Sequence, residues 1–167
     1  MAETKRDRDH FATPELVVRE TGAFVPEQQA YLNLIRAAEI LSTPISELMA
    51  THGLSGKQYN VLRSVRRGGQ GGLSISEIGA QMTDPRADVT RLVDRLLKAG
   101  LVERYHDEAD RRVVRVRLSD AGGRTLSALD APLLDVHRAQ FAELTADELE
   151  QLTTLLRKAR SGGPQPR

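Results

Sequence analysis

One group of side chains in this sequence has the types and spacing to contact DNA bases. Ala87, Arg91, Asp94 and Lys98 recur along one side of a short polar segment, with Arg95 beside them. An arginine on such a face can donate two parallel hydrogen bonds to the edge of a guanine. A short helix with cations and hydrogen-bonding groups facing out fits a DNA major groove.

A second group lies in the polar turn at 107–112, which ends in Asp110-Arg111-Arg112. Arginines at the tip of such a turn can reach phosphates or a narrow minor groove. The sequence therefore places Arg111 and Arg112 at the tip of a basic turn.

The first group requires a helix to carry it, and the pattern from Asp84 to Gly100 predicts one. Asp84 is a suitable N-cap and Pro85 a suitable first residue. Gly100 suits the left-handed residue that ends a helix. The apolar positions recur with the helical period and predict a buried face made of Val89, Leu92, Val93, Leu96 and Leu97.

The second group requires a hairpin. Residues 101–106 and 113–118 are rich in β-branched or aromatic residues, and the second run alternates apolar with basic.

Before the polar helix, Ser55 with Gln58 and Ser74 with Glu77 form two capping boxes, each opening a helix. Two short helices, a polar-faced helix and a basic hairpin predict a mainly α (α+β) winged helix-turn-helix lobe over 54–118.

The distribution of charge supports the same segment. The formal net charge is only +1. Residues 85–117 nevertheless hold nine cations (Arg86, Arg91, Arg95, Lys98, Arg104, Arg111, Arg112, Arg115, Arg117) and six anions (Asp88, Asp94, Glu103, Asp107, Glu108, Asp110). We expect Arg95 and Lys98 to lie on a solvated face. With so small an excess, non-specific DNA binding should be weak.

The flanking segments predict a dimer. Residues 1–25 form an arm, partly disordered, with room for a short helix around 15–20, and residues 161–167 a disordered tail. Residues 26–53 and 119–160 form helices with apolar stripes that the small lobe cannot cover alone. Pro44 and Pro132 should kink or split these helices. We expect the stripes of two copies to pack together as dimerisation helices in a symmetric dimer, the alternative being packing on their own chain.

Composition excludes several other classes. There is no cysteine, so disulfides, thiolate metal sites and cysteine nucleophiles are absent. The four histidines are scattered without ligand spacing, and the glycines at 68–72 follow no strand, so we expect no metal, no cofactor and no phosphate-binding loop. No catalytic motif is present, and we expect no enzyme activity. No apolar run is long enough to span a membrane or serve as a signal peptide core, and we place the protein in the cytoplasm.

Several motifs in order resemble the MarR family of bacterial transcription regulators. They are Leu54-Ser55 through Leu62, 73–79 (LSISEIG), 89–96 (VTRLVDRL), 100–104 (GLVER), Asp110-Arg111-Arg112 and 118–122 (LSDAG), within a match from about Gln28 to Ala159. The combination of the polar helix with GLVER and the Asp-Arg-Arg turn carries the resemblance.

The resemblance implies a homodimer that binds palindromic double-stranded DNA, most often as a repressor. By position, it implies that Arg86, Ala87, Thr90 and Arg91 lie at the end of the helix that enters the groove, with Arg91 on a base edge and Arg86 and Thr90 on phosphates or flanking bases. It also implies that one of Arg111 and Arg112 enters the minor groove while the other pairs with Asp110, and it does not say which does which. It also implies that a small-molecule effector, often aromatic or phenolic, releases the DNA. His52, Tyr59 and Arg63 fall where the family's ligand crevice would lie, although core packing of Tyr59 and solvent exposure of the other two are the simpler interpretation. The competing hypothesis is a winged-helix module that binds another protein and no DNA, which the low net charge and the acidic residues near the polar helix favour.

Overall fold

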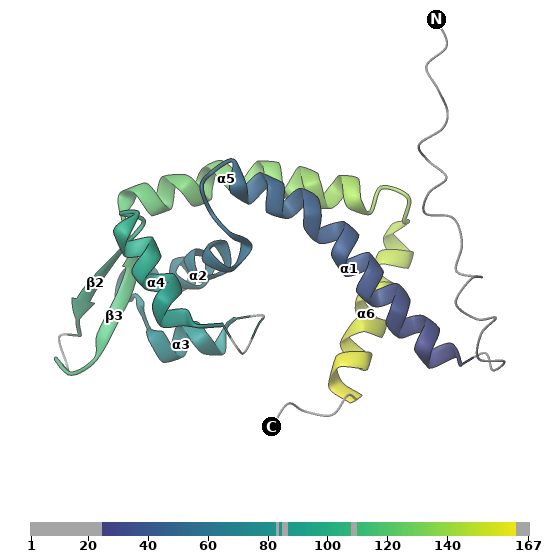
Figure 1. The fold of residues 1–167 in the computed structure, drawn as a ribbon, viewed down its shortest axis with the longest axis horizontal. Coiled ribbons are helices and arrows are strands. Elements are labelled where there is room, and N and C mark those ends of the chain that lie inside the picture. The colour runs from purple at the N-terminus through teal and green to yellow at the C-terminus, as the bar shows by residue number, and fades with distance from the viewer. Residues whose placement is uncertain (1–24, 83, 85–86, 108–109, 163–167) are drawn as a thin grey trace, which may run out of the picture. The chain divides into compact units, whose positions relative to one another are not determined.

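The computed structural model describes residues 25–82, 84, 87–107 and 110–162. Its elements are mainly helical, with one small antiparallel sheet, as the sequence predicts (Figure 1). The chain forms two structural units, residues 1–40 and 41–167, and the boundary between them falls inside the first helix. The arm expected at 1–25 lies outside the described residues apart from Val25.

Helix α1 (Pro26–Ala50) runs without a break through Pro44. Of the kink or split predicted at Pro44, the split is therefore wrong. A proline removes one backbone hydrogen bond and crowds the preceding turn. Here Ile45 and Leu48, which closely follow the proline, pack against the core, and Met49 is fully buried. Packing beyond the proline therefore keeps the last turns of the helix in place.

The two predicted capping boxes open α2 (Gly56–Arg67) and α3 (Ile75–Ala80). The Ser55 hydroxyl accepts from the Gln58 backbone N–H, and the Ser74 hydroxyl accepts from that of Glu77. In each box the side chain three residues on accepts a hydrogen bond from the cap's own N–H. Between the helices lies the short 3₁₀ helix η2 (Gly69–Gly71).

Helix α4 (Val89–Lys98) begins four residues later than the sequence predicts. The N-cap is Asp88, whose carboxylate accepts from the Arg91 backbone N–H at 3.1 Å. Asp84 lies before the helix, where Lys57 holds it at 2.8 Å. The predicted cap at Asp84 is therefore wrong, and residues 83, 85 and 86 lie outside the described residues. Gly100 has φ +68°, as the predicted helix end requires.

The sheet has the order β1-β3-β2 and is antiparallel throughout. Strands β2 (Val102–His106) and β3 (Val114–Leu118) form the predicted wing, with Arg104 opposite Val116. The two-residue strand β1 (Leu73–Ser74) pairs with Val116 and Arg115 and was not predicted. It attaches the wing to the start of α3.

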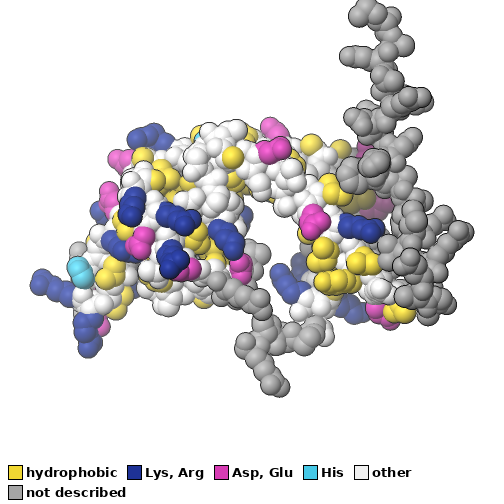
Figure 2. Space-filling model, viewed as in Figure 1, with side chains coloured by type: hydrophobic (Ala, Val, Ile, Leu, Met, Phe, Trp, Pro, Cys, Tyr) yellow, Lys and Arg dark blue, Asp and Glu magenta, His cyan; other side chains and the backbone are white. Residues whose placement is uncertain are grey.

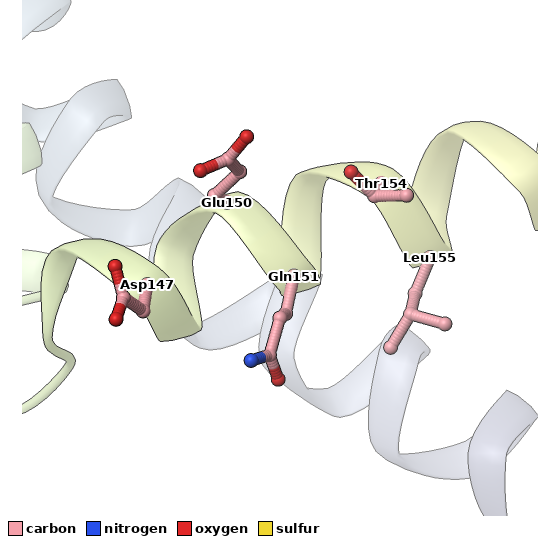
Figure 3. Close-up of a pocket in the computed structure, with 5 residues that line it drawn as sticks. All are labelled: Asp147, Glu150, Gln151, Thr154 and Leu155. Carbon is pink, nitrogen blue, oxygen red and sulfur yellow. The ribbon is translucent and has the colours of Figure 1, made fainter.

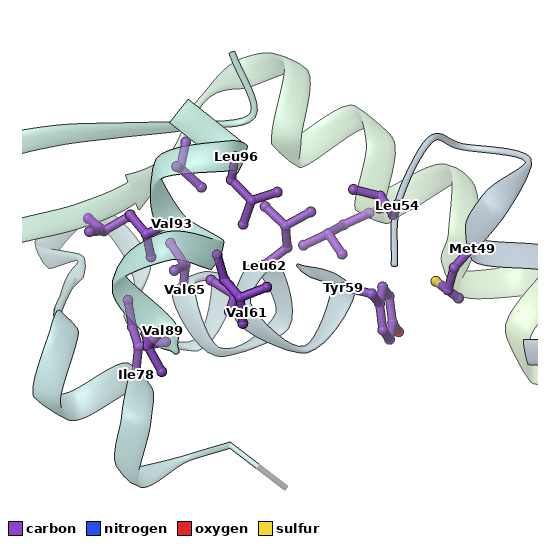
Figure 4. Packing of buried hydrophobic residues seen from close by; sticks show 14 of the residues in the cluster. Met49, Leu54, Tyr59, Val61, Leu62, Val65, Ile78, Val89, Val93 and Leu96 are labelled. Carbon is purple, nitrogen blue, oxygen red and sulfur yellow. The ribbon is translucent and has the colours of Figure 1, made fainter. Parts of the chain in front are cut away.

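One apolar core joins the helices to the sheet (Figure 4). Leu62 and Val65 of α2, Ile78 of α3, and Val93 and Leu96 of α4 are buried together. The predicted inner face of α4 is confirmed, with Val89, Leu92, Val93 and Leu96 buried and Leu97 partly so. The opposite face of α4 is thereby left toward solvent.

Helix α5 (Asp120–Gln140) is capped by Ser119 and continues through Pro132, so the predicted break is wrong here too. Leu129 and Leu133, on either side of the proline, are both buried in the core. Their packing holds the helical path through the proline. Helix α6 (Ala146–Gly162) opens with a capping box between Thr145 and Glu148. It extends over residues 161 and 162, where a disordered tail was expected, while 163–167 lie outside the described residues.

Candidate nucleic-acid interface

The outward face of α4 carries the polar residues expected there. Thr90, Arg91, Arg95 and Lys98 are all exposed, and the Arg91 side chain is 80% exposed. Arg91 lies 3.1 Å from the Asp88 carboxylate one turn earlier. Such an exposed pair is worth well under about 1 kcal/mol, so it leaves the guanidinium available to a stronger partner. Ala87 precedes the cap, half-buried and packed against the core.

The wing turn is held by a network of charged hydrogen bonds. The Asp110 carboxylate accepts from the Arg112 backbone N–H and from its guanidinium, each at 3.0 Å. These bonds lower the pKa of Asp110 below its ordinary value, with the Arg112 side chain as the largest cause. Arg115 bridges Asp107 within the wing and Glu77 of α3. The turn is thus tied both to itself and to the helix behind it.

These contacts show which wing arginine pairs with Asp110, a question that the sequence left open. Arg112 is the residue that pairs with Asp110. Arg111 is exposed, and in the described part of the wing its guanidinium has no carboxylate partner. Its backbone carbonyl lies 2.7 Å from Nδ1 of His106, so the histidine supports the segment that presents it. Residues 108 and 109 of the same turn lie outside the described residues.

A chain of contacts connects α4 to the wing. Arg104 of β2 reaches Asp94 of α4 at 2.7 Å. His106, two residues along the same strand, lies on the same face of the sheet as Arg104 because side chains alternate along a strand. That histidine contacts the Arg111 carbonyl. The wing tip is therefore positioned from the face of β2 against which α4 lies.

Most other cations near this surface are matched by carboxylates. Arg117 pairs with Glu103 at 3.0 Å and lies over the Tyr105 ring, 5.2 Å from its centroid. On the face shown in Figure 2, Lys and Arg side chains gather over the lobe that holds α4 and the wing, with Asp and Glu among them. Within the described parts of α4 and the wing, Arg95, Lys98 and Arg111 lack an ion-pair partner. The modest positive excess predicted from composition is thus carried by few side chains.

The three residues considered for a ligand crevice lie on α2, in the case of Tyr59 and Arg63, and just after α1, in the case of His52. Tyr59 is buried in the core, and the Arg63 guanidinium lies over its ring at 5.9 Å from the centroid. His52 follows the last turn of α1, where its Nδ1 lies near the Thr51 hydroxyl and the Leu48 carbonyl. Tyr59 and Arg63 are thus brought together, while His52 belongs to the end of another helix.

A separate pocket of about 530 Å³ lies along α6 (Figure 3). Its described lining consists of Asp147, Glu150, Gln151, Thr154 and Leu155, all projecting from that one helix. Within the described residues, no group of three potential metal ligands occurs. No described helix is both long enough and apolar enough to cross a bilayer.

The sequence model of the MarR family matches residues 54–114, which span the lobe from α2 into the wing. The transcriptional repressor MdtR of Bacillus subtilis is 30% identical over 112 residues, covering 67% of this chain and 71% of MdtR. The multiple antibiotic resistance protein MarR of Salmonella typhimurium is 32% identical over 106 residues, covering 63% of this chain and 72% of that protein.

Solved structures agree with these sequence matches. A mutant of Escherichia coli MarR in complex with operator DNA aligns with a TM-score of 0.66 and 25% identity, covering 80% of this chain and 91% of that one. BpsR of Bordetella bronchiseptica, whose DNA binding is regulated by 6-hydroxynicotinic acid, aligns with a TM-score of 0.68 and 26% identity, covering 79% of this chain and 98% of that one. The chain therefore belongs to the MarR family.

Proposed function

We propose that this protein is a dimeric, DNA-binding transcription regulator, acting as a repressor on a palindromic operator. The observation that carries the proposal is the linkage of α4 to the wing through Asp94–Arg104 and His106–Arg111. It holds an exposed helix face and an arginine-tipped hairpin in one lobe, as reading a major groove and the adjacent minor groove requires. The operator complex of the related E. coli MarR supports the same use of this fold.

Individual side chains take the following roles. Arg91 contacts a base edge, with guanine the best match to its two parallel donors. Thr90 and Arg86 contact phosphates or flanking bases, and Ala87 contributes at most its backbone or methyl group because it is half-buried. Arg111 enters the minor groove, while Arg112 keeps the turn folded through Asp110.

Exposed apolar side chains outside the lobe support the dimer. Tyr31 is 62% exposed and is followed by Leu34 and Ile35 on α1, and Leu155 on α6 is 63% exposed beside Leu156. Apolar residues at helical spacing on a protein surface favour a partner, since burying each of these roughly half-exposed side chains would contribute about 1 kcal/mol. In our proposal, residues 26–53 and 119–160 of two copies cover one another, and the two lobes then meet half-sites about 34 Å apart, one helical turn.

We also propose that a small aromatic molecule regulates the DNA binding of this protein. Its support is the relative BpsR, whose DNA binding 6-hydroxynicotinic acid regulates, together with the Tyr59–Arg63 contact in this chain. An aromatic carboxylate suits an arginine beside a ring, because it can stack and pair at once. Such a ligand lowers operator affinity only if it binds more tightly to the conformation of the dimer that cannot bind DNA. Titrating aromatic carboxylates into a protein–operator complex, with an Arg63→Ala variant as control, tests this part.

The first experiment is selection of bound sequences from random duplex DNA, followed by anisotropy titration of the selected duplex. A selected palindrome with two half-sites supports the regulator. The competing hypothesis, a winged-helix module for another protein, predicts no sequence enrichment and no saturable binding even at low salt, where phosphate contacts are strongest. That outcome would overturn the proposal.

A further inference from the structure

An ion pair outside the proposed DNA surface links the lobe to the long helix that leaves it. Arg66, near the end of α2, donates to both carboxylate oxygens of Asp130 on α5, at 2.8 and 3.0 Å. Sixty-four positions separate the two residues in the sequence. Two parallel hydrogen bonds between a planar guanidinium and a planar carboxylate fix orientation as well as distance. The contact therefore constrains how α5 lies against α2.

The beginning of α5 is fixed by different contacts. Gly122 lies so close to the backbone of Leu101 that a Cβ there would meet the Leu101 oxygen at 2.0 Å. The Ser119 hydroxyl donates to the Gly100 carbonyl at 2.6 Å. These contacts hold the first turn of α5 against the end of α4. They fix the position of one end of α5, and a second fixed position along the helix is needed to define the direction of its axis.

Apart from these contacts, α5 meets the described residues of the lobe through apolar side chains. Leu126, Leu129 and Leu133 are buried in the lobe's core. Dispersion and hydrophobic contacts are largely non-directional, so leucines alone allow small rotations and slips of one helix on another. The Arg66–Asp130 pair supplies the second, directional point.

We propose that Arg66 is a positioning residue: by gripping Asp130, it sets the direction in which α5 leaves the lobe and hence the half-site spacing that the dimer accepts. This inference rests on the proposed function, in which α5 leads from the lobe to the dimer contact. Asp130 lies eight residues after Gly122, about 12 Å along the helix at about 1.5 Å per residue. A displacement of about 1 Å at Asp130 would therefore tilt α5 by roughly 5°.

The pair is well placed for such a role without being essential to folding. Both side chains are about half exposed, 42% for Arg66 and 48% for Asp130. The bidentate contact lowers the pKa of Asp130 below its ordinary value, with the Arg66 hydrogen bonds as the main cause. A half-exposed pair contributes modestly to stability, so its removal should leave a folded protein whose DNA binding can be measured.

The test compares three variants on the selected operator and on duplexes with one or two base pairs inserted between the half-sites. Asp130→Asn removes the carboxylate charge, and Arg66→Lys keeps the positive charge but loses the fork. Arg67→Gln is the matched control, because Arg67 is the neighbour at the end of α2 and has no carboxylate partner among the described residues. We expect Asp130→Asn and Arg66→Lys each to weaken binding to the natural spacing by about two- to fivefold. Both should also reduce discrimination against the inserted duplexes, with the salt dependence of binding unchanged.

Other results would overturn the inference. If Arg66 contacts phosphate directly, Arg66→Lys keeps its affinity and Asp130→Asn binds DNA more tightly, because a competing anion has gone. If the pair only stabilises the fold, both variants melt at lower temperature while their spacing preference matches that of Arg67→Gln. Failure of the proposed function is distinguishable from these, since the wild-type protein itself would then select no operator.

Discussion

Replacing either of two adjacent glycines at the start of α5 by alanine should change the stability of the protein in opposite directions. A Cβ added at Gly122 would lie 2.0 Å from the Leu101 carbonyl oxygen, whereas one added at Gly123 would meet nothing within 4 Å. Alanine favours a helix over glycine by about 1 kcal/mol at either position. The substitution should therefore stabilise the protein at Gly123 and destabilise it at Gly122, where a steric cost opposes the helical gain.

The size of that cost follows from what must move. Real Cβ atoms essentially never come within 3.0 Å of a heavy atom, so the 2.0 Å approach requires the Leu101 carbonyl and α5 to separate by about 1 Å. The same oxygen accepts from the Ser119 backbone N–H at 3.2 Å, and the separation weakens that bond. Overpacking of this kind costs about 1–3 kcal/mol, and the lost hydrogen bond adds about 1 kcal/mol. After the helical gain of about 1 kcal/mol is subtracted, Gly122→Ala should lower stability by about 2 kcal/mol.

Thermal unfolding of both variants at one protein concentration checks the prediction, because a dimer's midpoint depends on concentration. For a chain of this length, about 2 kcal/mol lowers Tm by about 4–8 °C, and the gain at Gly123 raises it by up to about 2–4 °C. A Gly122→Ala variant as stable as the wild type would refute the close approach of α5 to Leu101. Equal losses at both glycines would show that flexibility, and not the contact, is what the first turn requires.

Three further outcomes are expected. Asp88→Ala should lower the free energy of unfolding, measured in urea, by about 1 kcal/mol, as loss of an N-cap does. Asp84→Ala, which removes an exposed ion pair, should lower it by less than about 0.5 kcal/mol. A larger loss at Asp84 than at Asp88 would indicate that Asp84 is the N-cap of α4. Hydrogen bonds from the serine cap of α3 lower the pKa of Glu77 below its ordinary 4.5, so its contribution to stability is present above that pH and is lost as pH falls through the lower folded value. A Glu77→Gln variant should show a flatter fall in stability below about pH 4.5, and an unchanged acid profile would contradict this role. Arg111→Ala should reduce the slope of log affinity against log salt concentration by about one, because it removes one phosphate contact. Arg112→Ala should instead loosen the wing turn and leave that slope nearly unchanged. If the two variants show the same slope, Arg111 does not have the proposed DNA contact.

Features set by neighbours in the chain were predictable from the sequence. The caps at Ser55, Ser74, Ser119 and Thr145 each depend on a residue three positions on. The buried face of α4 follows from helical spacing alone. Local rules also explain the main error, since Asp84 and Asp88 both satisfy them and Pro85 favoured the wrong one. In the structure Asp88 caps the helix, while Asp84 pairs with Lys57, a residue on another helix that the local pattern does not reveal.

Features set by distant segments were not predictable. Strand β1 has two residues and exists only because it pairs with β3, about forty positions later. The division of roles between Arg111 and Arg112 depends on how the turn folds around Asp110. The Arg66–Asp130 pair joins two helices with the rest of the lobe between them in sequence. The family resemblance predicted the fold class correctly because it rests on several motifs in order. It did not predict these contacts between distant segments.

If the exposed face of α4 reads bases, Arg91 should matter for the operator and not for DNA in general. This is measured by the affinity of Arg91→Ala, beside Arg95→Ala, for the selected operator and for random duplex DNA at the same salt concentration. We expect Arg91→Ala to weaken operator binding by about 1–3 kcal/mol while its binding to random DNA changes little, and Arg95→Ala to affect both duplexes slightly and equally. Unchanged operator affinity in Arg91→Ala, or an equal loss on both duplexes, would contradict it.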